Sequence, residues 1–506
     1  MMLWWLVPLN VYSNDSLKNQ AYLEPFRILL PREPLGLDFQ AYSQFTTLQL
    51  GQYTHDPLFT LKNGEAIPVL IDHYEWQTPT RWLFALKKAV KFHDGTELTS
   101  QDVVATFNRA FRLKNNTYKF IKDYRITALS KYEFQIDTEK PNSELLWDLE
   151  DVLILKHTAE NLDNGVLDKE LIIGTGPYQL IDRQGFKRFD FKSFPDYHRG
   201  EAYIRQVVLS VETDEEKQVQ SFLQGDADMI YILSEGNIEY LKGKANITQK
   251  TNHHLRMIFL DVYREQSPYL TDHDGNMLAR NPFKEIKVRQ AISKALDREV
   301  LILNMFGVNS IVKPAGQLVN ENSRWFDPTL NYEHENLAEA RDLLREAGYP
   351  DGFQVIVHNV DTPRRELILK LLAEMLEKVG IVVKIAMVPL NEYIERMNNH
   401  EYAVSISSYT TDGNLAEMLA QKLYSGAKGN NGRYSNALHD QFIDEAMVQT
   451  SDILKERLLH KAQRVAMEDL ALIPLYFESD NWAIRPGMIY VPTDQYYTEA
   501  YYVRPN

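Results

Sequence analysis

The chain has 506 residues, more than a single hydrophobic core normally supports, so two or more lobes are expected. Its composition is that of a globular protein, and its formal net charge of −15 disfavours a nucleic-acid partner, because phosphate binding needs clustered Lys and Arg. The absence of cysteine excludes disulfides, thiolate metal sites and a cysteine nucleophile.

The N-terminal residues 1–23 are expected to be a signal remnant or an N-terminal extension. Residues 3–9 form a short apolar run like that of a secretory signal, although no Lys or Arg precedes it. The alternative for this run is a short buried strand. Farther along the chain, charged residues interrupt every apolar stretch before it is long enough to cross a membrane.

Residues 81–111 predict a strand, a turn and a capped helix in succession. Apolar residues alternate from Trp82 to Phe92, as in half-buried strands, and residues 93–95 (His-Asp-Gly) favour a tight turn. Residues 99–102 place hydroxyl groups and an acid where a helix begins. The expected apolar face of this helix consists of Val103, Val104, Phe107 and Phe111.

The later segments alternate between turns, helices and strands. Residues 174–178 (GTGPY) predict a turn before a strand; a dinucleotide-binding loop is excluded because Pro177 follows the second glycine. Helical periodicity predicts one helix from residue 288 that stops at Gly307. Two more helices are expected over residues 336–347 and 364–379, and a strand over residues 381–388 continues the second of these as an α/β unit.

Several of these segments resemble family 5 extracellular solute-binding proteins, the dipeptide- and oligopeptide-binding receptors of bacterial ABC importers. The matching blocks include KFHDGTELTSQDVV, GTGPY, VRQAISKALDR and AEARDLLREAGYPDGF, in the family's order. The resemblance extends over roughly residues 37–474.

The resemblance implies an α/β fold like that of the type II, cluster C periplasmic binding proteins. Two lobes are joined by hinge strands, and an α+β subdomain is inserted in the first lobe. Lobe I is expected to combine residues 24–50, 172–257 and 470–506, the inserted subdomain residues 51–171, and lobe II residues 258–469.

The resemblance also implies a receptor that encloses a small peptide or another amine-bearing solute between its lobes. It would act as a monomer in the periplasm or cell envelope, without a lipobox cysteine, and deliver the solute to an ABC permease complex in the inner membrane. No cofactor, metal or catalytic residue is expected, since hydrolase and P-loop motifs are absent from the sequence. The alternative is a regulatory protein that senses a solute with the same fold and does not transport it.

The expected ligand site follows the strand that ends near residue 410. In peptide-binding relatives a Trp-x-x-Asp pattern stands here, and its Asp receives the ligand's α-ammonium; Tyr409 and Asp412 occupy these positions. Ser408, Thr410 and Thr411 would offer main-chain hydrogen bonds to an extended ligand. The alternative for Asp412 is that it caps a turn or the following helix.

Two further residues are candidates for ligand contact. Phe45 would face the ligand from lobe I, with core packing as its alternative, and Arg364 would bind a carboxylate from the start of a helix, with solvation as its alternative. Arg365 and Arg256 have the same status as Arg364. Because Tyr409 replaces the usual Trp, amino sugars, opines and metal chelates stay open as ligand classes.

Overall fold

The computed structural model describes residues 22–42, 44–62, 64–113, 124–150, 152–159, 172–232, 234–410, 413–449, 451–494 and 497–506. The expected signal remnant, apart from residues 22 and 23, lies outside the described residues, as do Thr411 and Asp412. In the described part of the chain, no helix is both long and apolar enough to cross a membrane.

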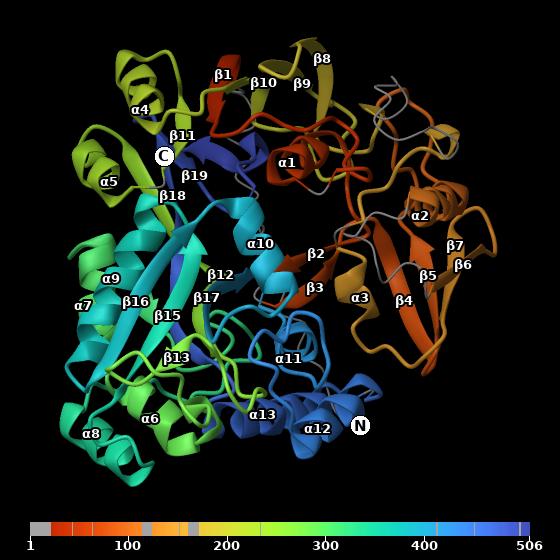
Figure 1. Ribbon diagram of the computed structural model, residues 1–506. Helices are drawn as coiled ribbons and strands as arrows, with labels where there is room; N and C mark the ends of the chain where they lie inside the picture. The colour runs from red at the N-terminus through yellow and green to blue at the C-terminus, as the bar shows by residue number, and fades with distance from the viewer. Residues whose placement is uncertain are drawn as a thin grey trace.

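A nine-stranded mixed sheet forms the spine of the molecule (Figure 1). Its order is β17-β12-β18-β11-β1-β10-β9-β8, with the short β14 paired to β18. The strands are β1 (Tyr22–Leu30), β8 (Tyr178–Gln184), β9 (Arg188–Ser193), β10 (Ile204–Val211), β11 (Met229–Tyr231), β12 (Asn246–Leu260), β14 (Lys313–Pro314), β17 (Val404–Thr410) and β18 (Ile473–Ile484).

The two long strands β12 and β18 connect β17 to the part of the sheet around β1, because β12 pairs with β17 and β18 pairs with β11. They run antiparallel, and their register shifts between Thr251 and Leu255. Such an irregularity bends a strand and increases its twist. The two strands therefore have the position of the expected hinge strands. The lobe boundaries given above stay predictions, and their names are used below for the corresponding regions.

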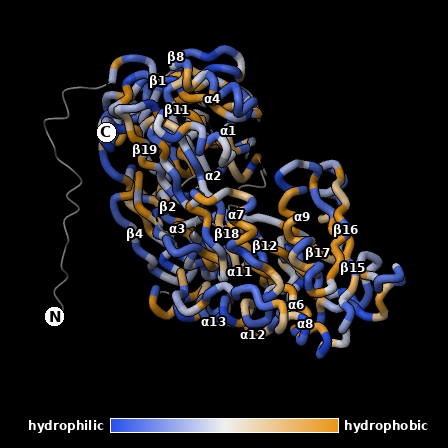
Figure 2. Tube along the Cα trace, turned by 90° about the vertical axis from the view of Figure 1, so that its left-hand side faces the viewer, coloured by the Kyte–Doolittle hydropathy of each residue, from blue (hydrophilic) through white to orange (hydrophobic). Residues whose placement is uncertain are grey.

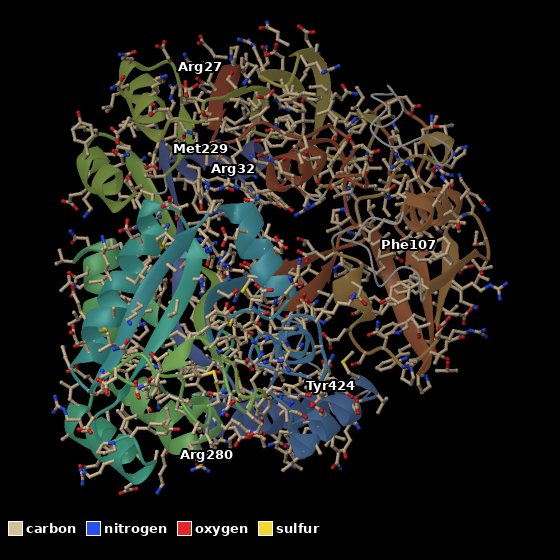
Figure 3. The ribbon with its side chains drawn as sticks, in the orientation of Figure 1. Arg27, Arg32, Phe107, Met229, Arg280 and Tyr424 are labelled. Carbon is tan, nitrogen blue, oxygen red and sulfur yellow. The ribbon has the colours of Figure 1, made fainter. Side chains whose placement is uncertain are left out.

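Lobe I contains the part of the sheet around β1, which pairs in parallel with β10 and β11. Its helices are α1 (Phe45–Thr54), α4 (Glu215–Gln224) and α5 (Glu235–Leu241), and a small sheet pairs β19 (Met488–Tyr490) with β20 (Val503–Pro505). In Figure 3, Arg27 and Met229 lie in this region, far from Phe107 of the inserted subdomain and from Arg280 and Tyr424 of lobe II.

The inserted subdomain has its own antiparallel sheet, in the order β4-β5-β7-β6, and its own apolar core. Its elements are β2 (Phe59–Lys62), β3 (Glu65–Pro68), β4 (Ile71–Thr78), β5 (Arg81–Leu86), α2 (Ser100–Leu113), β6 (Tyr124–Ala128), β7 (Glu133–Thr138), α3 (Leu145–Asp148) and the 3-10 turn His157–Ala159.

The succession expected for residues 81–111 is confirmed, with one exception. Gly95 has φ +84° in the turn, and Asp102 accepts hydrogen bonds from the backbone and hydroxyl of Thr99 at 2.7 and 2.8 Å, which caps α2. The expected face is wrong at Phe111, which is 57% exposed. The buried side of α2 follows Val103, Phe107 and Ala110, so position 111 turns toward solvent.

Lobe II is an α/β layer with helices around it. The parallel pair β15 (Phe353–Val360) and β16 (Ile381–Val388) is connected by α9 (Pro363–Glu377), as the sequence predicts. The other elements are β13 (Leu270–Thr271), the 3-10 turn Pro282–Lys284, α6 (Ile286–Lys294), α7 (Arg298–Phe306), α8 (Leu337–Glu346), α10 (Leu390–Asn398), α11 (Leu415–Lys422), α12 (Ala437–Met447) and α13 (Asp452–Glu468). Viewed from the side in Figure 2, the β15 and β16 layer stands at one end of the molecule.

The single helix expected from residue 288 to Gly307 is wrong, because the structure has two, α6 and α7. The side chain of Asp297 accepts a hydrogen bond from the backbone of Val300 at 2.9 Å and so begins a new helix. Apolar spacing continues through this break, which is why periodicity alone did not reveal it.

The GTG turn has a structural role where lobe I meets the inserted subdomain. A Cβ on Gly174 would lie 2.0 Å from the carbonyl oxygen of Thr54, and one on Gly176 would lie 2.5 Å from the carbonyl carbon of that residue. Only glycine permits this close backbone approach. The hydroxyl of Thr175 donates to Asp56 at 2.9 Å.

Candidate functional site

A small cavity lies where the carboxyl end of β15 meets the start of α9. In open α/β sheets, ligands bind in the crevice outside the carboxyl ends of the strands. Thr362 caps α9 by accepting from the backbone of Arg365, which places Arg364 and Arg365 in the first helical turn. The cavity has a volume of about 130 Å³ and is lined by Arg256, Met305, Asn359, Thr362, Arg364, Arg365, Ile368, Ile406, Tyr476 and Glu478.

Glu478, on the hinge strand β18, is the anionic centre of this cavity. It accepts a hydrogen bond from Arg256 of β12 at 2.6 Å, and Arg364 of α9 lies 3.8 Å from its other oxygen. Burial alone would raise the pKa of Glu478, but the charges of Arg256 and His254 outweigh it and hold the pKa at about 2. Glu478 is therefore a carboxylate at neutral pH.

Three arginines and a single carboxylate line this cavity, so its lining carries excess positive charge. Arg365 donates to the amide oxygen of Asn359 at 2.9 Å, and Arg364 lies 5.2 Å from the centre of the Phe306 ring. The Nε atom of Arg256 is buried without a hydrogen-bond partner. This arrangement suits a ligand carboxylate, which guanidinium groups bind with paired hydrogen bonds.

Strand β17, which carries Ser408, Tyr409 and Thr410, lies beside this cavity and at the edge of the large sheet. Ser408 is opposite Arg256 of β12. Within the described residues, β17 pairs only with β12, so no strand is hydrogen-bonded to its other edge, although β15 lies close to β17. Tyr409 points to α11: its hydroxyl donates to Glu417 at 2.9 Å, and Lys422 lies 3.7 Å from the ring centre.

The turn after β17 is described only on its far side, because Thr411 and Asp412 lie outside the described residues. Gly413 has φ +84°, and the hydroxyl of Ser323 donates to its carbonyl oxygen at 2.7 Å. The N-cap of α11 is Asn414, whose side chain accepts from the backbone of Glu417 at 3.1 Å. Helix α11 therefore does not depend on Asp412 for its cap.

Phe45 is the first residue of α1 and lies in lobe I. Its ring centre is 5.3 Å from that of Tyr497, and 38% of the residue is exposed. Plain core packing, the alternative for Phe45, is therefore wrong. The exposed Phe45 ring thus pairs with the half-buried ring of Tyr497.

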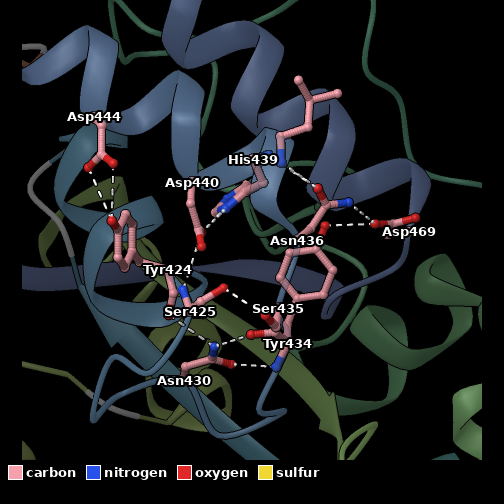
Figure 4. A network of polar contacts seen from close by, with 11 residues as sticks. Tyr424, Ser425, Asn430, Tyr434, Ser435, Asn436, His439, Asp440, Asp444 and Asp469 are labelled. Carbon is pink, nitrogen blue, oxygen red and sulfur yellow. Dashed lines mark hydrogen bonds and ion pairs between the residues drawn. The ribbon is translucent and has the colours of Figure 1, made fainter.

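The segment after α11 is held by the hydrogen-bond network in Figure 4. Asn430 donates to the carbonyl oxygen of Tyr434 at 2.7 Å, and the hydroxyl of Tyr434 donates to Asp469 at 2.7 Å. Asp469, directly after α13, also accepts from Asn436 at 2.9 Å. With Asn414 at its start and this network beyond its end, α11 gives the turn at Gly413 a firm support.

The histidine pair 253–254 lies at the irregular part of β12. His253 Nδ1 and His254 Nε2 are buried without hydrogen-bond partners among the residues described. Burial lowers the pKa of His253 to about 4, so it is neutral at pH 7. No group of three or more His, Cys, Asp or Glu that suits a metal ion occurs among the residues described.

Sequence reasoning missed Glu478 as the partner of the arginines. A signal was present, since Glu478 and Asp480 stand in a strand of otherwise mainly apolar residues, and a buried carboxylate is costly unless it is paired. The hinge position of that strand, however, depends on its pairing with β12, some 220 residues earlier in the chain.

The fold and this site define a two-lobed binding protein of the type II periplasmic class. A structure of the ABC transporter substrate-binding protein CtaP from Listeria monocytogenes has the same fold, with a TM-score of 0.82, 18% identity, and coverage of 95% of this chain and 99% of the other. The expected fold class is confirmed.

The family model "Bacterial extracellular solute-binding proteins, family 5 Middle" matches residues 65–431, and the chain belongs to this family. Di/tripeptide-binding protein 1 of Pseudomonas aeruginosa is 22% identical over 483 residues, which cover 87% of this chain and 84% of the relative. Heme-binding protein A of Haemophilus influenzae is also 22% identical, over 484 residues, which cover 88% and 85%. The family resemblance seen in the sequence is confirmed.

Proposed function

We propose that this protein is the substrate-binding receptor of an ABC importer, and that it encloses a small peptide or another amine-bearing solute between two lobes. The observation that carries the proposal is the cavity lined by Arg256, Arg364, Arg365 and Glu478, next to the unpaired edge of β17. A cation-rich cavity beside an unpaired strand edge suits a ligand with a carboxylate and an extended backbone.

In this proposal each expected residue has a distinct role. Asp412 binds the ligand's ammonium group, Ser408, Thr410 and Thr411 hydrogen-bond its backbone, and Arg364 binds its carboxylate. Tyr409 packs against α11 and keeps β17 in place, as its hydrogen bond to Glu417 supports. Phe45, paired with Tyr497, faces the ligand from lobe I. Closure of the two lobes follows from ligand contacts that both make.

The names of the relatives and of the solved structures support a role in transport. They also show which classes of ligand this fold binds in other proteins. The relatives include proteins named as binding dipeptides, tripeptides, glutathione and heme, and the solved structures include one in complex with agropinic acid. They give no support to the regulatory alternative. We further propose that the protein acts as a monomer in the periplasm or cell envelope, delivers its solute to a membrane permease, and performs no catalysis.

Native mass spectrometry of gently purified protein, followed by calorimetry with dipeptides, tests this function. The proposal predicts a one-to-one complex with a solute that carries an amine, or saturable binding of at least one dipeptide. A protein that carries no solute and binds no dipeptide would contradict it.

A further inference from the structure

A second, larger cavity lies between the inserted subdomain and lobe II. It has a volume of about 460 Å³, within the usual range for small-molecule sites. From the inserted subdomain it is lined by Glu65, Ala66, Tyr74, Trp76, Trp82, Ser143, Leu146 and Trp147, and from lobe II by Arg324, Trp325, Gln449, Asp452 and Lys455. It shares no lining residue with the Arg364 cavity.

Tryptophan is concentrated in this cavity. The chain has seven tryptophans; Trp4 and Trp5 lie outside the described residues, and four of the other five line the cavity. Trp76 and Trp82 form a stacked pair across β4 and β5, with ring centres 4.8 Å apart and planes 9° apart. The remaining two, Trp147 of the inserted subdomain and Trp325 of lobe II, belong to or pack against one apolar cluster.

The polar groups of the cavity are balanced in charge. Arg324 lies 4.5 Å from the centre of the Trp325 ring and forms only long ion pairs, at 3.8 Å to Glu65 and 3.5 Å to Asp452. The side chains of Glu65 and Asp452 are 57% and 73% exposed, so both can still accept hydrogen bonds. Lys455, the second cation, is paired with Glu144.

We propose that this cavity binds a neutral saccharide about the size of a disaccharide. The two cations are balanced by Glu65, Asp452 and Glu144, so no excess positive charge attracts an anion, whereas the hydrogen-bonding groups of the cavity match the hydroxyl groups of a sugar. Trp82 and Trp325 are buried, so the half-buried Trp76 and Trp147 offer the flat apolar surfaces on which the C–H face of a sugar ring stacks. Arg324 supplies a fixed fork of donors next to one of these rings.

An occupant of this cavity touches both the inserted subdomain and lobe II. A ligand stabilises the conformation that it binds most tightly. A saccharide in this cavity would therefore stabilise the contact between the inserted subdomain and lobe II. The saccharide is a different ligand from the amine-bearing solute proposed above, and its cavity adjoins the turn at Gly413, because a Cβ on Gly64 would lie 3.3 Å from the carbonyl oxygen of Gly413.

Fluorescence titration with cellobiose, maltose, trehalose and chitobiose tests the inference, because most of the described tryptophans line the cavity. We expect a saturable change in fluorescence with at least one of these sugars, at concentrations up to about 1 mM. A dissociation constant of about 1 mM corresponds to a binding free energy of about 4 kcal/mol. Trp147→Ala and the milder Asp452→Asn should each weaken binding by about tenfold or more, measured by calorimetry.

Trp482→Phe is the matched control, since Trp482 lies in the lobe I core and not in this cavity. It should keep the affinity of the unmodified protein for the sugar. The inference is overturned if none of the four sugars binds, or if Asp452→Asn and Trp147→Ala, both shown to be folded by circular dichroism, bind the sugar as tightly as the unmodified protein.

Discussion

The side-chain amide of Asn414 donates a hydrogen bond of 2.9 Å to Glu144, 270 residues earlier in the chain. Both groups are buried, and Glu144 also pairs with Lys455 of α13. The backbone N–H of Ser143 donates to the carbonyl oxygen of Met447 at 3.1 Å. Asn414 caps the helix that follows the expected ammonium site, so this contact links the turn at the site to the inserted subdomain.

Glu144→Ala should lower the free energy of unfolding by about 3 kcal/mol, because it leaves the buried ammonium group of Lys455 without its partner. Urea unfolding measures this loss. Glu33→Ala is the control, since the Glu33 and Lys187 side chains are 43% and 68% exposed. That change should cost less than about 1 kcal/mol. Equal losses of unfolding free energy in the two variants would show that the buried ion pair of Glu144 does not stabilise the protein more than an exposed one.

Arg364→Gln should weaken a dipeptide by about tenfold, because a charge-assisted hydrogen bond to its carboxylate is lost. The fold should be unaffected, since the Arg364 side chain is 44% exposed. Calorimetry with a dipeptide and its C-terminal amide gives the sharper result: the unmodified protein should prefer the free acid, and the variant should not. A preference of equal size in both proteins would exclude Arg364 as the carboxylate partner. Arg345→Gln, at an exposed position outside the site, is the control.

Gly413→Ala should destabilise the protein more than Gly426→Ala. Both glycines have a positive φ, +84° and +78°, so alanine is strained at either position. A Cβ at Gly413 would also lie 3.0 Å from the His253 ring, whereas at Gly426 it meets nothing within 4 Å. Thermal unfolding should show a loss of about 1 kcal/mol for Gly426→Ala and a larger one for Gly413→Ala. Matching losses would mean that the His253 ring moves aside freely.

Asp480→Asn should remove part of the pH dependence of stability. Burial raises the pKa of Asp480 to about 6, although Tyr231 and Asn252 donate hydrogen bonds to it. Between about pH 4 and pH 6 the unfolded chain loses this proton first, so the contribution of Asp480 to stability falls as the pH rises.

Urea unfolding at several pH values between 4 and 7 measures this effect as the difference between the unmodified protein and Asp480→Asn. As the pH rises from about 4 to 6, the free energy of unfolding of the variant should increase relative to that of the unmodified protein. Asp342→Asn, whose carboxylate is 61% exposed, should follow the unmodified protein. A constant difference between the unmodified protein and Asp480→Asn would show that Asp480 titrates normally.

Local patterns predicted local structure well. The cap at Thr99 and Asp102, the helix expected over residues 336–347 and the α/β unit around α9 all depend on residues close in sequence, and the structure has each of them. The break at Asp297 was missed because apolar spacing runs through it, and a single capping bond decides it.

The site was predicted less completely, because its partners are distant in sequence. Arg364 was a candidate from its helix position, but Glu478 became visible only when β12, β18 and α9 came together. The tryptophan-lined cavity forms where the inserted subdomain contacts lobe II, and no local sequence pattern predicts that contact. The prediction of Asp412 as a ligand residue came from the family resemblance. Its neighbours in the sequence are equally compatible with a capping residue.

The most direct measurement is calorimetry of a dipeptide with the unmodified protein and with Asp412→Asn, each also titrated with the N-acetylated dipeptide. Enclosing an ammonium group requires an anionic partner, and its removal should cost about 3 kcal/mol, a loss of about a hundredfold in affinity. The account predicts that loss for the free amine and little change for the acetylated form. Equal affinity of the two proteins for the free dipeptide would contradict it.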